Sequence, residues 1–413
     1  MCTLLAQSEQ LDRLAEIAIR IGVRVAEGQE LIITAPIEAL PLVRKITECA
    51  YRAGSPLVTT LFTDQQAILT RFEHAHDHSF DRSTGWLFEG MASAFRSGAA
   101  RLAVIGEDPS LLSGQDPGKI ARANRSRSVA YKPTLDLISS FSMNWSLVPY
   151  VTSSWAAAVF PQYPLDKAVT RLWQIVFAAT RATEPDAVAA WNAHNGDLRA
   201  RTSLLNGKRY SALHFRGPDT DLRVGLADGH KWAGGAAIAR NGITCNTNIP
   251  TEEVFTAPHR SRVEGYVTST RPLSYMGTTI SDIRVRFEQG RIVEASAKRG
   301  SEIFQQLLEV DEGARRLGEV ALVPCSSQIS RSGILFHNTL FDENAASHLA
   351  LGQSYSKCFI DGSDQEKDDF RARGANSSLM HVDWMIGSPD LQVDGLSEGG
   401  AIDPIMRSGE WTT

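Results

Sequence analysis

Two residues near the C-terminus, His381 and Asp383, place an imidazole and a carboxylate within the apolar segment MHVDWMI. The apolar pattern predicts a β-strand, in which these two side chains share a face and lie about 7 Å apart along the chain. Burying a carboxylate beside an imidazole is costly unless something compensates both groups. A hydrogen bond between them in a core would do so, and so would a bound metal ion. This segment alone leaves both interpretations open.

Three further segments of the C-terminal half carry acidic residues or a histidine in well-patterned contexts. The segment NIPTEEVFTAPH contains Glu253, and Glu319 lies at the start of the apolar stretch EVALVP. The segment LFDENAASHLALGQSY contains Glu343, His348 and Tyr355. Each acidic residue by itself is more often a helix cap or a surface residue. Their occurrence together in one region favours a common site.

The chemistry of these groups indicates metal binding. Carboxylates and imidazoles without thiolates suit divalent Zn, Co or Mn. Four carboxylates and two imidazoles exceed what one catalytic ion needs, and they fit two ions that share a bridging carboxylate. Such a pair turns water into hydroxide near neutral pH and polarises a carbonyl, as hydrolysis requires. Because Glu343 and His348 are five residues apart, they would lie about 140° apart on one helix, so Glu343 is expected at a helix start or from another direction.

The histidine-rich segment FEHAHDHSF, with His74, His76 and His78, is a weaker candidate. It lacks one residue between His76 and Asp77 compared with the HxHxDH pattern of metallo-β-lactamase-like hydrolases, and a helical segment precedes it. We interpret it as a solvated loop or helix end. The sequence also lacks GxGxxG and GxxxxGK[ST], so it predicts no nucleotide site.

Composition excludes several classes of protein. A net charge of −5 without a Lys/Arg block argues against a nucleic-acid partner. The longest apolar stretches are far shorter than the ~18 residues of a membrane span, and the N-terminus lacks the charged region of a signal peptide. Five cysteines are scattered and form no CxxC pair, which fits reduced thiols in the cytoplasm.

The length of 413 residues favours two domains. Helix-like and strand-like segments alternate in the first half, which predicts an α/β domain with a mostly parallel sheet over residues 1–185. Helices are expected over 165–181 and 186–206. Strand and turn patterns then dominate, so residues 186–413 are predicted to form a β-rich α+β catalytic domain. The Gly/Ser/Asp-rich tail from residue 388 is expected to be irregular.

The segments NIPTEEVFTAPH, LGEVALVP, DENAASHLALGQSY and MHVDWMIG, in this order, resemble the M29 family of metallo-aminopeptidases, the aminopeptidase T group. The resemblance covers essentially the whole chain. It implies two divalent metal ions per chain, peptide substrates with a free N-terminus, and cytoplasmic homodimers whose active sites face an enclosed cavity. The metal ligands that it implies are Glu253, Glu319, Glu343, His348, His381 and Asp383, and the implied catalytic side chain is Tyr355. We expect Glu319 to bridge the two ions.

Tyr355 has two possible roles. It follows His348 by seven residues, close to two helical turns, so an unbroken helix would place both on one face, although Gly352 lies between them. The tyrosine hydroxyl could donate a hydrogen bond to the oxyanion that forms when hydroxide attacks a carbonyl. Alternatively, the ring packs against the segment SKCFI and positions the chain.

A second reaction class remains open. Some proteins of the same fold are ring-cleaving dioxygenases that hold one Fe(II) with two histidines and a carboxylate, and the HVD segment supplies half of such a triad. No histidine follows His381, however, and Glu253, Glu319 and His348 would then be surplus. A metal-free binding protein would leave the clustered ionisable residues without a role. The preferred N-terminal residue cannot be derived from any of these patterns.

Overall fold

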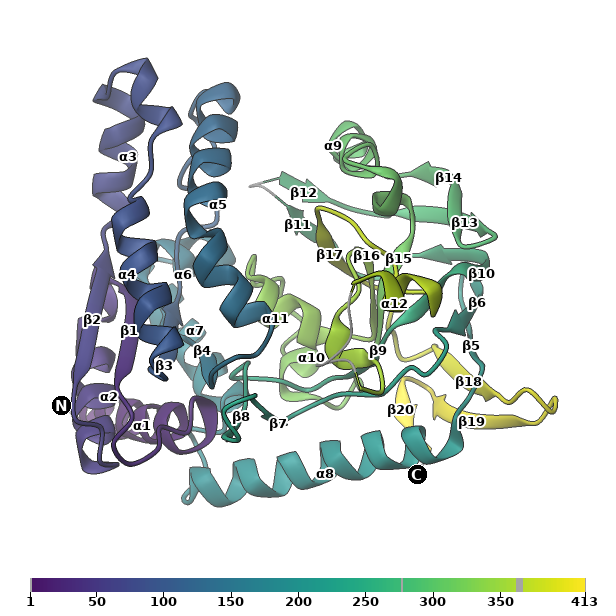
Figure 1. The fold of residues 1–413 in the computed structure, drawn as a ribbon, viewed down its shortest axis with the longest axis horizontal. Coiled ribbons are helices and arrows are strands. Elements are labelled where there is room, and N and C mark those ends of the chain that lie inside the picture. Colours follow the sequence, from purple (N-terminus) through teal and green to yellow (C-terminus); the bar gives the residue numbers. More distant parts are fainter. Residues whose placement is uncertain (1, 276–277, 362–366, 413) are drawn as a thin grey trace. The chain divides into compact units, whose positions relative to one another are not determined.

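The computed structural model describes residues 2–275, 278–361 and 367–412 (Figure 1). The chain forms two compact units: the first comprises Met1–His194 with Ala236–Pro250, and the second comprises Asn195–Gly235 with Thr251–Thr413. The division falls within helix α8 (Ala187–Lys208), close to the predicted boundary at residue 185, and a later segment returns to the first unit. The assignment of residues 1–185 and 186–413 to two separate domains stays a prediction.

The first unit is built on a four-stranded parallel sheet, as the alternating pattern predicts (Figure 1). Its strand order is β2-β1-β3-β4. The strands are β1 (Leu31–Pro36), β2 (Val58–Thr63), β3 (Ala100–Ile105) and β4 (Trp145–Pro149). The helices are α1 (Cys2–Ile17), α2 (Leu40–Arg52), α3 (Gln65–His74), α4 (Gly85–Arg96), α5 (Pro117–Ser139), α6 (Ser153–Val159) and α7 (Leu165–Ala179).

Helix α2 illustrates how the apolar pattern directs packing. Its buried residues, Leu42, Val43, Ile46 and Ala50, recur at helical spacing and form one face. The helices expected over 165–181 and 186–206 correspond to α7 and α8. None of the described helices is long and apolar enough to cross a membrane.

The histidine-rich segment is solvated, as predicted. Helix α3 ends at His74, and a short 3-10 helix, Asp77–Asp81, follows. The side chains of His74, His76 and His78 are all exposed. They therefore form no enclosed site.

The second unit is a β-rich α+β structure, again as predicted. An eight-stranded antiparallel sheet has the order β14-β13-β10-β6-β5-β18-β19-β20, and a four-stranded antiparallel sheet has the order β17-β16-β15-β9. The larger sheet consists of β5 (Ala212–Gly217), β6 (Thr220–Leu226), β10 (Pro258–Thr268), β13 (Arg284–Glu288), β14 (Arg291–Ser296), β18 (Gln392–Leu396), β19 (Ile402–Arg407) and β20 (Glu410–Trp411). The smaller sheet consists of β9 (Val254–Thr256), β15 (Leu317–Leu322), β16 (His348–Gly352) and β17 (His381–Met385). A continuous core that includes Phe215, Phe287, Phe304 and Trp384 lies among these strands.

The prediction of an irregular tail from residue 388 is wrong, because β18, β19 and β20 extend the large sheet. The residues that made the tail look irregular have partners far away in the sequence. Buried Asp394 pairs with both Arg216 and Arg407. Gly395 lies so close to Tyr210 that a Cβ atom there would be 2.6 Å from the ring. These polar and small residues are therefore required by the sheet rather than incompatible with it.

Candidate metal centre

The four-stranded sheet brings together residues from four distant segments of the chain. Glu319 on β15 pairs with Ala350 on β16, and Ala350 pairs with Asp383 on β17. These three residues form one row across the sheet, and directly paired residues point to the same face. His348 is two residues before Ala350, and His381 is two residues before Asp383, so both histidines share that face. The prediction that His381 and Asp383 point the same way along a strand is confirmed.

The fourth strand adds Glu253 to the same face. Phe255 on β9 pairs with Ala321 on β15, and Ala321 also pairs with His348 on β16, the other neighbour of β15. Glu253 precedes Phe255 by two residues and therefore points the same way if the extended backbone continues. The same face carries the small residues Ala321, Ala350 and Gly352, and the row that contains His348 also carries the larger side chains of Phe255 and Met385. The carboxylates and imidazoles therefore converge on a face whose row between Glu319 and Asp383 contains only Ala350.

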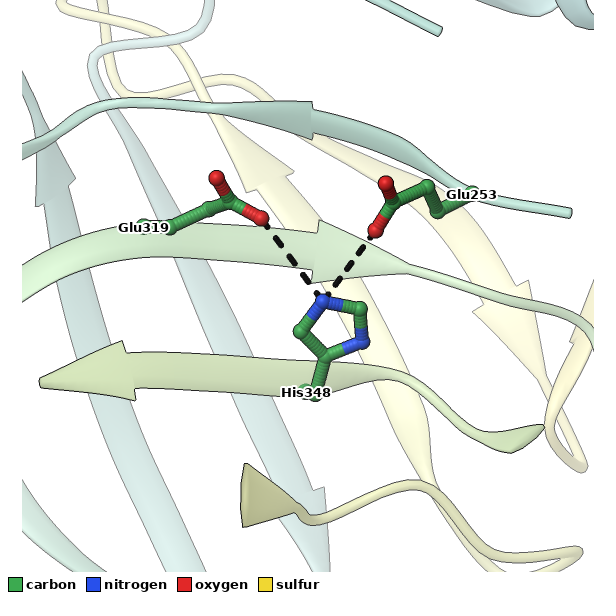
Figure 2. Close-up of side chains that lie close together, drawn as sticks. All are labelled: Glu253, Glu319 and His348. Atoms are coloured by element: carbon green, nitrogen blue, oxygen red, sulfur yellow. Dashed lines mark ion pairs between the residues drawn. The ribbon is translucent and has the colours of Figure 1, made fainter. Parts of the chain in front are cut away.

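The ligand atoms lie close together in a buried environment. His348 Nε2 lies 3.2 Å from Glu253 Oε2 and 3.6 Å from Glu319 Oε1, and Figure 2 shows both carboxylates pointing at this ring nitrogen. His381 Nε2 lies 3.4 Å from Asp383 Oδ1. Two groups of three residues each have ligand atoms within 4.8 Å of one another. These groups are Glu253, Glu319 and His348, and Glu319, His381 and Asp383, so Glu319 belongs to both.

Backbone carbonyls fix the orientation of both imidazoles. His348 Nδ1 lies 3.1 Å from the carbonyl oxygen of Ala346, and His381 Nδ1 lies 2.7 Å from that of Gln353. Since a carbonyl oxygen can only accept, Nδ1 must donate its proton in each case. In the neutral ring Nε2 then carries the lone pair, and it faces the carboxylates. This is the arrangement that histidine ligands of metal ions adopt.

The cluster has too much negative charge to be satisfied by its own groups. Burial raises the pKa of Glu319 and, still more, that of Glu343, and the neighbouring carboxylates add to both shifts. Burial opposes protonation of the imidazoles, but the acidic neighbours outweigh it, holding the pKa of His348 well above its usual range and raising that of His381 to about 10. Moreover, Glu253 Oε2 and Asp383 Oδ1 accept no hydrogen bond within the described part of the chain. Such groups fit divalent cations, which would replace the protons that the cluster otherwise needs.

Glu343 approaches the cluster from outside the sheet. It lies at the start of a 3-10 turn (Glu343–Ala345) that follows the short helix α11 (Thr339–Asp342), and it is not part of either group of three. Its raised pKa results from burial and from the charges of Glu253 and Asp383, so its carboxylate lies near theirs. The chain becomes extended at Ala346. The helix considered for residues 343–348 is therefore wrong, and Glu343 faces the cluster from outside the sheet; its role as a metal ligand stays a prediction.

Asn344 supports this arrangement, although no sequence pattern marks it. Its buried side chain accepts a hydrogen bond of 2.7 Å from the backbone N–H of Glu252 and donates one of 2.9 Å to the carbonyl of Leu340. It thereby links the segment before β9 to the turn that carries Glu343. Its burial and its hydrogen bonds are visible only in the fold, so sequence reasoning missed it.

Tyr355 borders the cluster, but not through a helix. Strand β16 and Gly352, with φ of +102°, separate it from His348, so the helical relation considered from the sequence is wrong. Its ring centroid lies 4.6 Å from that of His381, and 41% of the residue is exposed. The pKa of Tyr355 is raised by partial burial and then by the charges of Glu319 and Asp383. The phenol is thus close to the carboxylates and also accessible from solvent.

Comparison with known proteins identifies the family. The model of the family described as thermophilic metalloprotease (M29) matches residues 7–411. The chain belongs to the M29 family. It is 52% identical to aminopeptidase T of Thermus thermophilus over 98% of this chain and 99% of the relative, and 42% identical to aminopeptidase 2 of Geobacillus stearothermophilus over 98% of each. The solved structure of wild-type AmpT from Thermus thermophilus matches with a TM-score of 0.93 at 51% identity, covering 98% of this chain and 99% of that one. The M29 membership confirms a metal-dependent hydrolase, and nothing in these comparisons supports the dioxygenase.

Proposed function

We propose that this protein is an aminopeptidase that removes N-terminal residues from peptides by metal-dependent hydrolysis. The observation that supports this most directly is the pair of overlapping ligand groups that share Glu319, in a chain of the M29 family. The M29 relatives with which it aligns end to end are named aminopeptidases. Peptides with a free N-terminus are therefore the proposed substrates.

The proposed cofactors are two divalent ions per chain, zinc, cobalt or manganese. The residues proposed to hold them are Glu253, Glu319, Glu343, His348, His381 and Asp383. Membership of Glu319 in both groups of three supports a bridging role for this carboxylate. When bound, such ions supply hydroxide at neutral pH and polarise the carbonyl of the scissile bond.

Side chains of this protein would contribute orientation and hydrogen bonding. The backbone carbonyls at Ala346 and Gln353 hold the two imidazoles with Nε2 directed at the cluster. The Tyr355 hydroxyl is proposed to donate a hydrogen bond to the developing oxyanion, because the phenol keeps its proton at neutral pH and lies near the carboxylates. The small residues Ala321 and Ala350 leave space above the sheet for the substrate carbonyl.

We further propose that the protein acts in the cytoplasm as a homodimer. The dimer follows from the M29 resemblance alone. The free thiols of Cys49, Cys325 and Cys358 support a reducing compartment. Light scattering coupled to size-exclusion chromatography measures the mass of the assembly, and a single-chain mass of 45.2 kDa would contradict the dimer.

Metal analysis together with a substrate panel tests the proposed activity. Protein purified without added ions should contain about two divalent ions per chain. A chelator should abolish the hydrolysis of leucine p-nitroanilide, and Zn²⁺, Co²⁺ or Mn²⁺ should restore it, whereas the N-acetylated substrate should never be cleaved. Full turnover by metal-free protein would refute the proposal. One iron per chain with oxygen consumption on an aromatic substrate would favour the dioxygenase instead.

A further inference from the structure

An exposed ammonium group, that of Lys357, lies beside the candidate metal centre. Lys357 belongs to the 3-10 turn Ser356–Cys358. Its Nζ lies 4.5 Å from the ring centroid of Phe255 and 5.4 Å from that of Tyr355. No ion pair involves this lysine within residues 2–275, 278–361 and 367–412. Two aromatic rings therefore position this charge beside the candidate metal centre.

Both aromatic rings that contact this ammonium group lie next to residues of the candidate metal centre. Phe255 follows Glu253 by two residues, and the ring of Tyr355 lies 4.6 Å from that of His381. Burial raises the pKa of the Cys358 thiol, Glu319 raises it further and Lys357 lowers it, so this thiol lies near both the acidic cluster and the ammonium group. The cluster of carboxylates and the ammonium group thus border the same small region.

The ammonium group is within reach of a short peptide bound at the metal centre, because two short steps through the Tyr355 ring set an upper limit on the separation. A step of 5.4 Å leads from Lys357 Nζ to the Tyr355 ring, and a step of 4.6 Å leads from there to the ring of His381. An extended chain spans at most about 3.6 Å per residue, so the C-terminal carboxylate lies about 4 Å from the first carbonyl in a dipeptide and about 7 Å from it in a tripeptide. With about 3 Å added for the contact with the ammonium group, a peptide with its first carbonyl at the metal centre can place its C-terminal carboxylate at Lys357.

We propose that Lys357 binds the C-terminal carboxylate of di- and tripeptides and so gives the protein a preference for short peptides with a free C-terminus. This inference rests on the proposed aminopeptidase function and specifies its substrate class. A zwitterionic peptide has an ammonium group at one end and a carboxylate at the other, which complements carboxylates at one side of the site and Lys357 at the other. Longer or amidated peptides have no charge at the required distance.

The test compares Leu-Leu with Leu-Leu amide on the metal-loaded protein at low ionic strength. We expect kcat/KM to be roughly fivefold higher for the free acid, the size of effect that a partly exposed ion pair provides. In Lys357→Met this ratio should fall to about one, in Lys357→Arg it should persist, and in Lys357→Glu it should invert. Lys298→Met, which removes an exposed lysine that has no ion pair in the described structure, is the matched control and should keep the parent ratio.

Salt dependence provides an independent measurement. Because the contact is partly exposed, the ratio in the parent should decrease towards one at about 0.5 M salt, where the Debye length is only about 4 Å. Equal kcat/KM values for both peptides in the parent, or an unchanged ratio in Lys357→Met, would overturn the inference and leave the aminopeptidase intact. If the metal-loaded parent cleaves neither peptide, the proposed function itself fails, and this inference fails with it.

Discussion

The variant Glu319→Gln should be more stable than the parent when metal is absent and less stable than the parent when metal is bound. The change keeps the size of the side chain and removes one negative charge from the middle of the cluster. Ligand atoms of Glu253 and Asp383 each lie within 4.8 Å of those of Glu319. At that distance and an effective dielectric constant of about 20, two like charges repel each other by about 3.5 kcal/mol. His348, at 3.6 Å, attracts Glu319 by about 4.6 kcal/mol when it is protonated.

In metal-free protein, the cost of desolvating the Glu319 carboxylate decides whether Glu319→Gln raises or lowers the free energy of unfolding. Attraction to the two imidazoles and repulsion from the two carboxylates nearly cancel, whereas burying a carboxylate costs several kcal/mol. Three carboxylates remain for two imidazoles, so no positive charge loses its compensation. The raised pKa of Glu319 reduces the gain, because a protonated glutamic acid is already neutral. We therefore expect metal-free Glu319→Gln to be about 1–3 kcal/mol more stable than the parent.

With metal the order inverts. A ligand at a hundred times its dissociation constant stabilises the parent by about 2.7 kcal/mol, and the variant loses most of this because Glu319 belongs to both groups of ligands. Scanning calorimetry with a chelator and with excess Zn²⁺ measures both states, at about 2–4 °C per kcal/mol for a unit of this size. Glu398→Gln, in an exposed turn, is the matched control and should shift neither transition. A metal-free Glu319→Gln that melts below the parent, or that gains as much from Zn²⁺ as the parent does, would refute the reasoning.

Three further predictions concern neighbouring features. His381→Ala and Asp383→Asn should each lose bound metal and activity while circular dichroism shows a folded chain, since the cluster is not what holds the sheet together; near-normal metal content in either variant would make these residues merely structural. Tyr355→Phe should lower kcat by about 10²–10³ with little change in KM or bound metal, and a kcat within about threefold of the parent would remove its hydroxyl from the mechanism. Gly395→Ala should cost about 1–3 kcal/mol, because its new Cβ would lie 2.6 Å from the ring of Tyr210, whereas Gly399→Ala, with nothing within 4 Å, should melt like the parent.

Local sequence patterns correctly predicted the helices and strands whose conformation depends mainly on residues nearby in the sequence. The strand that carries His381 and Asp383 follows from alternation, and the parallel sheet of the first unit follows from the succession of buried strands and amphipathic helices. These features depend on neighbours within a few residues. The local sequence does not decide the conformation of the segment from Glu343 to Tyr355, because its alanines and leucines suit a helix as well as a strand. Pairing on both sides of β16 decided its conformation, which is a tertiary effect that outweighs propensity.

The arrangement of the site depends on pairings that the sequence does not encode locally. Glu253, Glu319, His348 and Asp383 come together only because β9, β15, β16 and β17 are neighbours in one sheet. A register shift of one residue in any of these strands would turn its acidic residue or histidine to the opposite face. The sequence therefore indicated which residue types could bind metal, whereas their common face and the supporting contact of Asn344 required the fold.

The row formed by Glu319, Ala350 and Asp383 gives the centre a fixed scale. Two steps between neighbouring strands, each about 4.8 Å, separate the backbones of the two acidic residues, and ladder hydrogen bonds hold that spacing. Ions bound as proposed would therefore have to fit a spacing that the sheet fixes, whereas a flexible pocket would adapt to each ion. Exchange of one divalent metal for another should then alter the rate without moving the strands. The small side chain of Ala350 lies between these two acidic residues on the same face, so a larger residue there would narrow the centre without replacing any proposed ligand.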